Sequence, residues 1–144
     1  MKFGGHVSIA GGLDRAIERG QKITADCIQI FVTPPQRWLK ANHSDEAVAK
    51  FLDAKASSGI GPILLHGLYL INLGSADDAL RQRSVDALVS QLGWSDRLGA
   101  MGVCFHVGSF GSEEREIGLA RAAEGIADIL TRADGTSPLL LETT

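Results

Sequence analysis

The sequence predicts an α/β fold in which parallel strands alternate with helices. Five short apolar runs begin at intervals of roughly 25 to 40 residues, the spacing of βαβ units. The four segments between them carry the apolar periodicity and the capping residues of helices. A complete eight-stranded βα barrel needs about 250 residues, so a chain of 144 residues has room for part of one. We therefore predict about five parallel strands and four helices of a partial (βα)8 TIM barrel.

The composition is that of an ordinary globular domain. Hydrophobic residues make up 44% and charged residues 22% of the chain, and a net charge of −3 gives no support to a generally basic nucleic-acid surface. Cys27 and Cys104 fall inside predicted strands without Cys-x-x-Cys spacing, so we interpret them as small buried residues of a reducing, cytoplasmic protein. The sequence shows neither a signal-peptide pattern nor an apolar run of about 18 residues, which predicts no export and no membrane insertion.

The first strands and helix follow from apolar patterning. We expect a strand over residues 2–7, a glycine-containing turn, and a helix over about 13–21. A second strand is expected over 27–32, where β-branched residues alternate. His6 lies near the end of the first strand, and we expect it to be a packed or supporting residue and not a direct ligand.

The loop at residues 33–38 contains two consecutive prolines, which exclude regular structure. It presents Gln36, Arg37 and Trp38 side by side. One interpretation is a surface turn with the indole folded back onto the barrel. The other is a functional loop above the carboxyl ends of the strands, and the sequence leaves both open.

The middle helices are marked by their caps. Ser44 is a suitable N-cap for a helix that ends at Gly59, and His43 before it is expected to be a solvated loop residue. After the apolar run at 62–65, Ser75 begins a capping-box-like segment that leads into a longer helix ending near residue 99.

The last third of the chain repeats the alternation. We expect a strand over residues 102–106, a helix that begins at Ser112 and closes at 134–135, and a fifth strand over 137–142. The apolar periodicity of this helix predicts a core face made of five residues. These are Leu119, Ala123, Ile126, Ala127 and Leu130.

Three of the predicted strands end on a side chain that can bind metal. His66, His106 and Glu142 each follow an apolar run directly. The carboxyl ends of parallel strands are where α/β folds place ligands, and two imidazoles with a carboxylate suit zinc or another divalent ion. Each histidine alone is also compatible with a satisfied core residue. The sequence lacks a phosphate-binding loop with its lysine and a Gly-x-Ser-x-Gly elbow, which leaves metal-assisted chemistry.

Several motifs stand out in order along the chain. They are GGHVSIAGGL at 4–13, Gln36-Arg37, His66 with YLINLG at 69–74, FHVGS at 105–109 and LETT at 141–144. Together they resemble the amino-terminal half of the endonuclease IV family of zinc-dependent apurinic/apyrimidinic endonucleases. The resemblance covers the whole chain, and it is specific in combination although no single motif is. The chain departs from the family pattern at Gly67-Leu68, where a polar Asp-Ser pair is common, and at Pro34-Pro35, which replaces a polar loop.

The resemblance implies roles for particular residues. It indicates that His66 and His106 bind one zinc ion and that Glu142, the expected catalytic carboxylate, bridges it to a second. Gln36 with Arg37, and Tyr69 with Leu70, match the segments that enter DNA at the lesion. His6 and Asn72 are expected to support the site from behind the ligands. The remaining ligands of the family come from later strands.

The implied activity is zinc-dependent incision of double-stranded DNA at abasic sites in base excision repair. We expect residues 1–144 to be the amino-terminal portion of a single barrel domain that needs a carboxy-terminal half for a complete site and is inactive alone. A metal-dependent sugar isomerase or epimerase with the same barrel type is the main alternative, and a non-catalytic DNA-binding or scaffold role is another.

Overall fold

The structure is a computed structural model that describes residues 1–142, and it contains one five-stranded parallel sheet with four helices. The predicted alternation of strands and helices is confirmed. In chain order the elements are β1 (Gly4–His6), α1 (Asp14–Lys22), β2 (Cys27–Ile30), α2 (Asp45–Ser58), β3 (Ile63–His66), α3 (Asp78–Arg97), β4 (Val103–His106), α4 (Arg115–Arg132) and β5 (Leu139–Glu142). The two threonines of the LETT motif lie outside the described residues.

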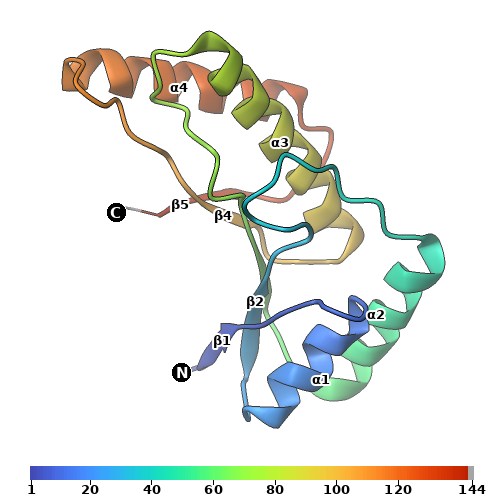
Figure 1. Cartoon of the computed structure of the whole chain (residues 1–144). Coiled ribbons are helices and arrows are strands. Elements are labelled where there is room, and N and C mark those ends of the chain that lie inside the picture. The colour runs from blue at the N-terminus through green and yellow to red at the C-terminus, as the bar shows by residue number, and fades with distance from the viewer. Residues whose placement is uncertain (143–144) are drawn as a thin grey trace.

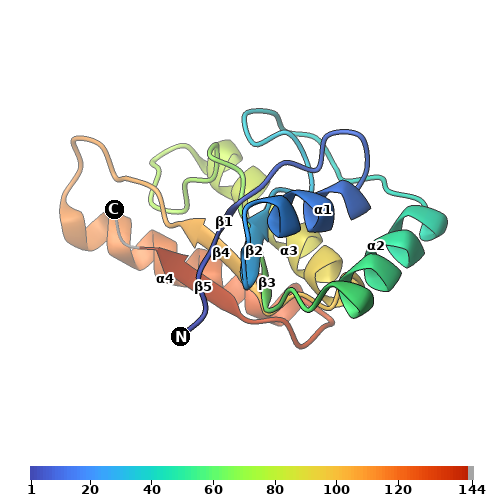
Figure 2. The ribbon, with the colours of Figure 1, turned by 90° about the horizontal axis from the view of Figure 1, so that it is seen from below.

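The sheet is an open part of a barrel. Its strand order is β1-β2-β3-β4-β5, every neighbouring pair is parallel, and β1 and β5 are the two edges. The helices lie on one side of the curved sheet (Figures 1 and 2). The partial TIM barrel predicted from the sequence is therefore confirmed. None of the helices in residues 1–142 is long and apolar enough to cross a bilayer.

Strand alternation decides which side chains face the core and which face the open side of the sheet. In β4, Val103 and Phe105 are fully buried under the helices, whereas Cys104 and His106 are only partly buried. Successive side chains of a strand point to opposite faces, so Cys104 and His106 share the open face. The same alternation explains why the cysteines are not fully buried, contrary to our expectation.

Helix caps confirm one predicted start and correct two others. The Ser44 hydroxyl accepts a hydrogen bond from the Ala47 backbone at 3.3 Å, and Gly59 ends α2 with φ of 74°. In contrast, α3 begins three residues after Ser75, because the Asp77 carboxylate accepts bonds from the two backbone N–H groups that need a cap. The last helix begins at Arg115 and not at Ser112.

The predicted core face of α4 is wrong except at Ile126, which is partly buried and packs against the core. Leu119 and Leu130 are 52% and 56% exposed, whereas Gly118, Ala122 and Ile129 are buried. The helix is packed through its small residues because they permit close approach. A Cβ atom at Gly118 would lie 2.3 Å from the Cβ atom of Phe110. Hydrophobic periodicity finds the bulkier stripe, which here stays on the surface.

His43 is also not the solvated residue that we expected. Its Nε2 atom lies 2.8 Å from the Val32 carbonyl oxygen, and its ring packs edge-on against Trp94 at 5.2 Å between centroids. The imidazole therefore ties the end of the loop after β2 back to the strand and to α3. The first two strands are also shorter than predicted, because their hydrogen-bonded register ends at His6 and Ile30.

Candidate metal centre

The three predicted ligands meet at the carboxyl edge of the sheet. His66, His106 and Glu142 are the last residues of β3, β4 and β5. The Nε2 atoms of both histidines lie 3.3 Å from the same carboxylate oxygen, Oε2 of Glu142. All three ligand atoms fall within 4.8 Å of one another. Within residues 1–142 this is the only group of three or more such side chains close enough to hold a metal ion.

Sheet register produces this convergence. In the β4–β5 pair, His106 stands directly opposite Glu142. In the β3–β4 pair, His66 stands opposite Cys104, two residues before His106 and on the same face. The two imidazoles consequently lie with their ring centroids 5.2 Å apart and nearly perpendicular. Backbone pairing alone thus brings together residues that are up to 76 positions apart in sequence.

The backbone selects one tautomer of His66. Its Nδ1 atom lies 2.7 Å from the Gly67 carbonyl oxygen. Since a carbonyl can only accept, Nδ1 carries a proton, and Nε2, which faces Glu142, is the nitrogen that the neutral ring would offer to a metal. Histidine ligands of metals are commonly oriented in this way through their second ring nitrogen. The His66 side chain is only 7% exposed, so its orientation is fixed by packing as well.

The geometry fits a tetrahedral zinc ion. With zinc–nitrogen and zinc–oxygen distances of about 2.0–2.1 Å, two ligand atoms of a tetrahedron lie about 3.3–3.4 Å apart. Both nitrogen–oxygen separations in the site have this value. The same separations exceed the usual 2.7–2.9 Å of a charge-assisted N–H···O bond. The two nitrogen–oxygen separations are therefore compatible with donors placed around one ion.

Glu142 is held in its charged form. Partial burial raises the pKa of its carboxyl, but hydrogen bonds from Cys104 and His66 and the positive charge of the two imidazoles outweigh that effect, so the pKa lies below its ordinary value. A carboxylate that stays ionised is available as a metal ligand at neutral pH. About 45% of the side chain is exposed, which leaves it open to solvent and to a substrate.

An aromatic wall borders the ligands. The ring of Tyr69 lies 5.7 Å from that of His66 and 6.1 Å from that of His106 between centroids. Phe31 contacts both His66 and Tyr69 edge-on, each at 5.1 Å. His6 packs on Phe31 at 4.3 Å, and its ring lies 6.1 Å from that of His66 between centroids. Its Nδ1 atom is 3.0 Å from the Gln29 amide oxygen.

Backbone bonds join the loops that carry the other predicted residues. The Tyr69 backbone N–H donates to the Pro35 carbonyl at 3.0 Å, which joins the loop after β3 to the loop of Gln36 and Arg37. The Asn72 side-chain oxygen accepts from the backbone N–H groups of Gly74 and Ser109, both at 3.1 Å, which joins the loops after β3 and β4. Asn72 thus lies in the loop framework and makes no bond to a ligand.

The residues that the sequence predicts to contact DNA differ in their exposure to solvent. Tyr69 is 54% exposed and lies beside the ligands. Gln36 and Arg37 are exposed on the neighbouring loop, and Leu70 is partly buried. No hydrogen bond within residues 1–142 ties the guanidinium of Arg37 to another residue. The loops that carry these side chains follow β2 and β3, at the same edge of the sheet as His66, His106 and Glu142.

Two residues of the site were not singled out by the sequence. Phe31 lies just beyond the end of β2 and forms the base of the aromatic wall. Cys104 lies with its sulfur 3.6 Å from the Oε2 atom of Glu142, the oxygen that both histidines approach. Counting two residues back from His106 along the strand would have placed Cys104 on the ligand face.

Comparison with known proteins agrees with this architecture. Residues 17–144 match the family model described as the xylose isomerase-like TIM barrel. The chain is 35% identical over 144 residues to a probable endonuclease 4 of Chloroflexus aggregans, an alignment that covers 99% of this chain and 50% of that protein. The chain spans about half the length of the curated relatives that it matches.

Solved structures separate a close relative from distant ones. Endonuclease IV from Thermus thermophilus superposes with a TM-score of 0.88 at 32% identity, over 100% of this chain and 52% of that one. A D-tagatose 3-epimerase-like protein superposes with a TM-score of 0.74 over 100% of this chain and 53% of its own, at only 17% identity, which shows a shared fold alone.

A parallel βα sheet whose strand ends carry side chains able to hold a metal ion is typical of a barrel protein with a site at the carboxyl face. The chain belongs to the xylose isomerase-like TIM-barrel family. Within that family it matches the amino-terminal half of endonuclease IV, as the sequence motifs predicted, and the resemblance to sugar epimerases does not extend beyond the fold.

Proposed function

We propose that this chain forms the amino-terminal part of a zinc-dependent endonuclease that incises double-stranded DNA at abasic sites in base excision repair. The convergence of two imidazole nitrogens on one carboxylate oxygen of Glu142 carries this proposal. The similarity to proteins named endonuclease 4 supports the nuclease assignment. The domain proposal is that residues 1–144 are one portion of a single barrel whose site also draws on residues outside this chain.

In this proposal His66, His106 and Glu142 hold zinc, and Glu142 is also the catalytic carboxylate. Zinc bound there would supply an activated water and charge neutralisation of a phosphodiester. The chain itself supplies orientation: the Gly67 carbonyl fixes the His66 ring, and the β4–β5 register holds His106 opposite Glu142. Another divalent ion with similar ligand preferences is compatible with the same donor set.

The exposed loop residues are proposed to engage DNA. An abasic nucleotide has no stacked base, so extruding it costs less than extruding a normal one. Tyr69 and Leu70 would fill the space left in the duplex, and Gln36 and Arg37 would contact the strand beside it. The Tyr69–Pro35 backbone bond supports this assignment because it makes the two loops one surface next to the ligands. The two free cysteines are compatible with the proposed cytoplasmic setting.

The test measures metal and incision in matched histidine variants. We expect His66→Ala and His106→Ala each to lower the zinc content of the purified protein, measured by atomic emission, because either change removes one of three donors. In a form that carries the complete barrel, the rate of incision of a duplex with a single abasic site should also fall by a factor of about 100 or more. Loss of a residue that only hydrogen-bonds to a metal ligand can already lower activity about 10- to 100-fold.

His43→Gln is the matched control. It removes an imidazole from the same sheet edge while keeping a donor for the Val32 carbonyl, which His43 now contacts. Zinc content should be unchanged in this variant. Zinc content equal to wild type in both His66→Ala and His106→Ala would remove them from the metal site. Chelator-insensitive incision by the complete barrel would contradict the zinc proposal itself.

A further inference from the structure

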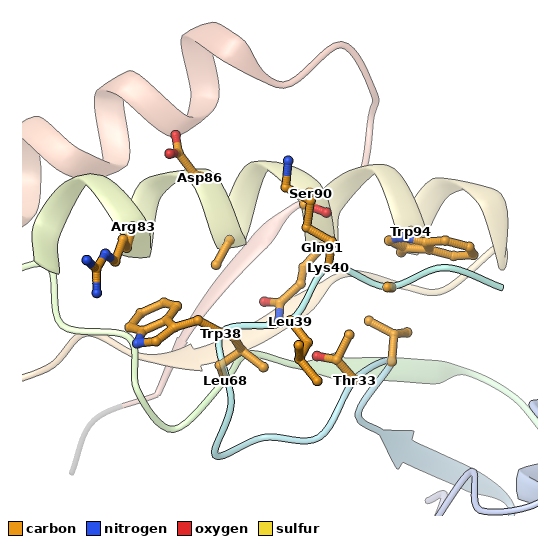
Figure 3. A pocket seen from close by; sticks show the side chains of 13 residues that line it. Thr33, Trp38, Leu39, Lys40, Leu68, Arg83, Asp86, Ser90, Gln91 and Trp94 are labelled. Carbon is orange, nitrogen blue, oxygen red and sulfur yellow. The ribbon is translucent and has the colours of Figure 1, made fainter. Parts of the chain in front are cut away.

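A hollow lies on the helix side of the molecule, apart from the candidate metal ligands. It has a volume of about 200 Å³ and is enclosed by α3 and the loop after β2 (Figure 3). Apolar side chains form most of its walls, among them Trp38 and Leu39 from the loop, Leu68, and Trp94 from α3. None of the three metal ligands lines it.

Two residues that line this hollow each carry a buried polar atom without a partner. The hydroxyl oxygen of Thr33 and the side-chain oxygen of Gln91 are closed to solvent, and neither has a hydrogen-bond partner within residues 1–142. Thr33 is 8% and Gln91 5% exposed. Figure 3 shows the Gln91 amide descending from α3 toward the loop that carries Thr33. A buried polar group without a partner costs about 1–3 kcal/mol, so two in one hollow require an explanation.

A trapped water molecule does not explain both atoms. A water needs about 10–15 Å³ of probe volume and two to four polar partners, whereas the hollow is many times larger and mostly apolar. The two oxygens are also shielded from a water-sized probe in the present arrangement. The hollow therefore has the size for an organic molecule that reaches these atoms when one wall moves.

The loop wall is the one that can move. Leu39 is 51% and Trp38 36% exposed, whereas Gln91 and Trp94 on α3 are buried. Exposed loop side chains change position more readily than residues packed in a helix. An entering molecule would displace the side chain of Leu39 or Trp38 and leave the α3 wall in place.

We propose that this hollow binds a small, neutral, planar aromatic amide. The Gln91 side-chain oxygen can only accept a hydrogen bond, which calls for an N–H donor. The Thr33 hydroxyl can donate to a carbonyl. An amide supplies both groups together, and an aromatic ring suits walls that include two indoles. Lys40, Arg83 and Asp86 also line the hollow, but the two buried oxygens without a partner belong to neutral side chains, so a neutral ligand group suits them.

The experiment uses the chain's own fluorescence. Trp38 and Trp94 are the two tryptophans of the sequence, and both line the hollow. Benzamide, N,N-dimethylbenzamide and toluene are titrated at fixed protein concentration and without added metal or DNA, so the result does not depend on the proposed endonuclease function. We expect a saturable change with benzamide, and binding at least about tenfold weaker for the dimethyl analogue, which lacks the N–H donor.

A variant tests the assigned contact. Gln91→Leu should weaken benzamide binding about tenfold and leave the dimethyl analogue unchanged, because only benzamide donates to the missing oxygen. Its melting temperature should not fall, since the oxygen has no partner in the free protein. Should this variant fail to fold, the comparison of the two amides on wild type decides the question.

Three results would overturn the proposal. The first is no saturable fluorescence change with benzamide up to its solubility limit. The second is equal binding of benzamide, the dimethyl analogue and toluene, which would make the hollow an apolar cavity without amide recognition. The third is a folded Gln91→Leu protein that binds benzamide as wild type does.

Discussion

Asn72 connects the loops after β3 and β4 through a single side-chain oxygen, and we predict the effect of removing that oxygen. That oxygen accepts hydrogen bonds from the backbone N–H groups of Gly74 and Ser109, each at 3.1 Å. It also packs against Gly108, where an added Cβ atom would lie 2.3 Å from the same oxygen. Gly108 has φ of 101°, so the turn needs glycine for its backbone as well as for space. We expect Asn72→Ala to loosen both loops.

The magnitude follows from the burial of the two donors. Gly74 is buried, so its N–H loses its partner without gaining water, a cost of about 1–3 kcal/mol. Ser109 is exposed, and its N–H can turn to water, so the loss there is about 0.5–1 kcal/mol. The sum is about 1.5–4 kcal/mol, which for a chain of this size lowers the melting temperature by about 5–15 °C.

The assay is a thermal melt followed by circular dichroism at matched protein concentration, together with zinc content. Asn72→Asp is the control because it retains an acceptor of the same shape, and it should lose less than half as much stability at pH 7. Zinc content should be unchanged in both variants, since the ligands lie on strands and Asn72 makes no bond to them. A melting temperature for Asn72→Ala equal to wild type, or equal losses in both variants, would refute the reasoning.

Three further predictions address the rim, the helices and the sheet edges. In a complete barrel, Arg37→Ala and Tyr69→Ala should each weaken binding to abasic duplex about tenfold at unchanged zinc content, since one stacked or ionic contact contributes about 1–3 kcal/mol; wild-type affinity in both would exclude them from the DNA surface. The hydrogen bond from Arg132 lowers the pKa of the Asp86 carboxyl and outweighs the opposite effect of partial burial. The contribution of Asp86 to stability is therefore fully present above the ordinary carboxyl pKa of about 3.9. It is lost as the pH falls through the lowered pKa of the folded state. Melts from pH 7 to 2 should therefore show a shallower acid loss in Asp86→Asn than in wild type. The 144-residue chain alone should self-associate and show no incision above background, because β1 and β5 are edge strands and Leu119 and Leu130 are exposed. The double variant Leu119→Glu with Leu130→Glu should shift the sedimenting mass toward the monomer mass of 15.3 kDa. A wild-type monomer that cleaves abasic DNA would contradict this prediction.

The sheet and the convergence of the three candidate ligands were predictable because both follow from position along the chain. An apolar run that ends on a histidine or glutamate defines a strand end, and parallel strands bring their carboxyl ends to one edge. His66, His106 and Glu142 therefore converge as the strand ends predicted. The hydrogen-bonded register places His106 opposite Glu142 without any special contact from the side chains themselves.

The parts that escaped prediction depend on the backbone and on close packing. The Gly67 carbonyl that orients His66 has no sequence signal, because every residue carries a carbonyl group. The buried face of α4 was missed because glycine at position 118 matters for the room it leaves to Phe110 and not for hydrophobicity. His43 was misjudged for a similar reason: its partner is the Val32 carbonyl, which only the folded loop brings within reach.

The candidate metal ligands and the exposed loop residues are held in place by different interactions, so we expect their substitution to have different effects. The ligands are fixed by strand register and by a backbone carbonyl, so their positions depend on the sheet. Tyr69 and the loop of Arg37 are held by hydrogen bonds within and between loops, among them the Tyr69–Pro35 bond and the bonds to Asn72, so they can shift while the sheet stays intact. Because proline has no N–H group, this loop depends on its carbonyl at Pro35 for its link to Tyr69. Changes in the loops should therefore alter affinity for DNA before they alter metal content, whereas changes at the strand ends should remove both together.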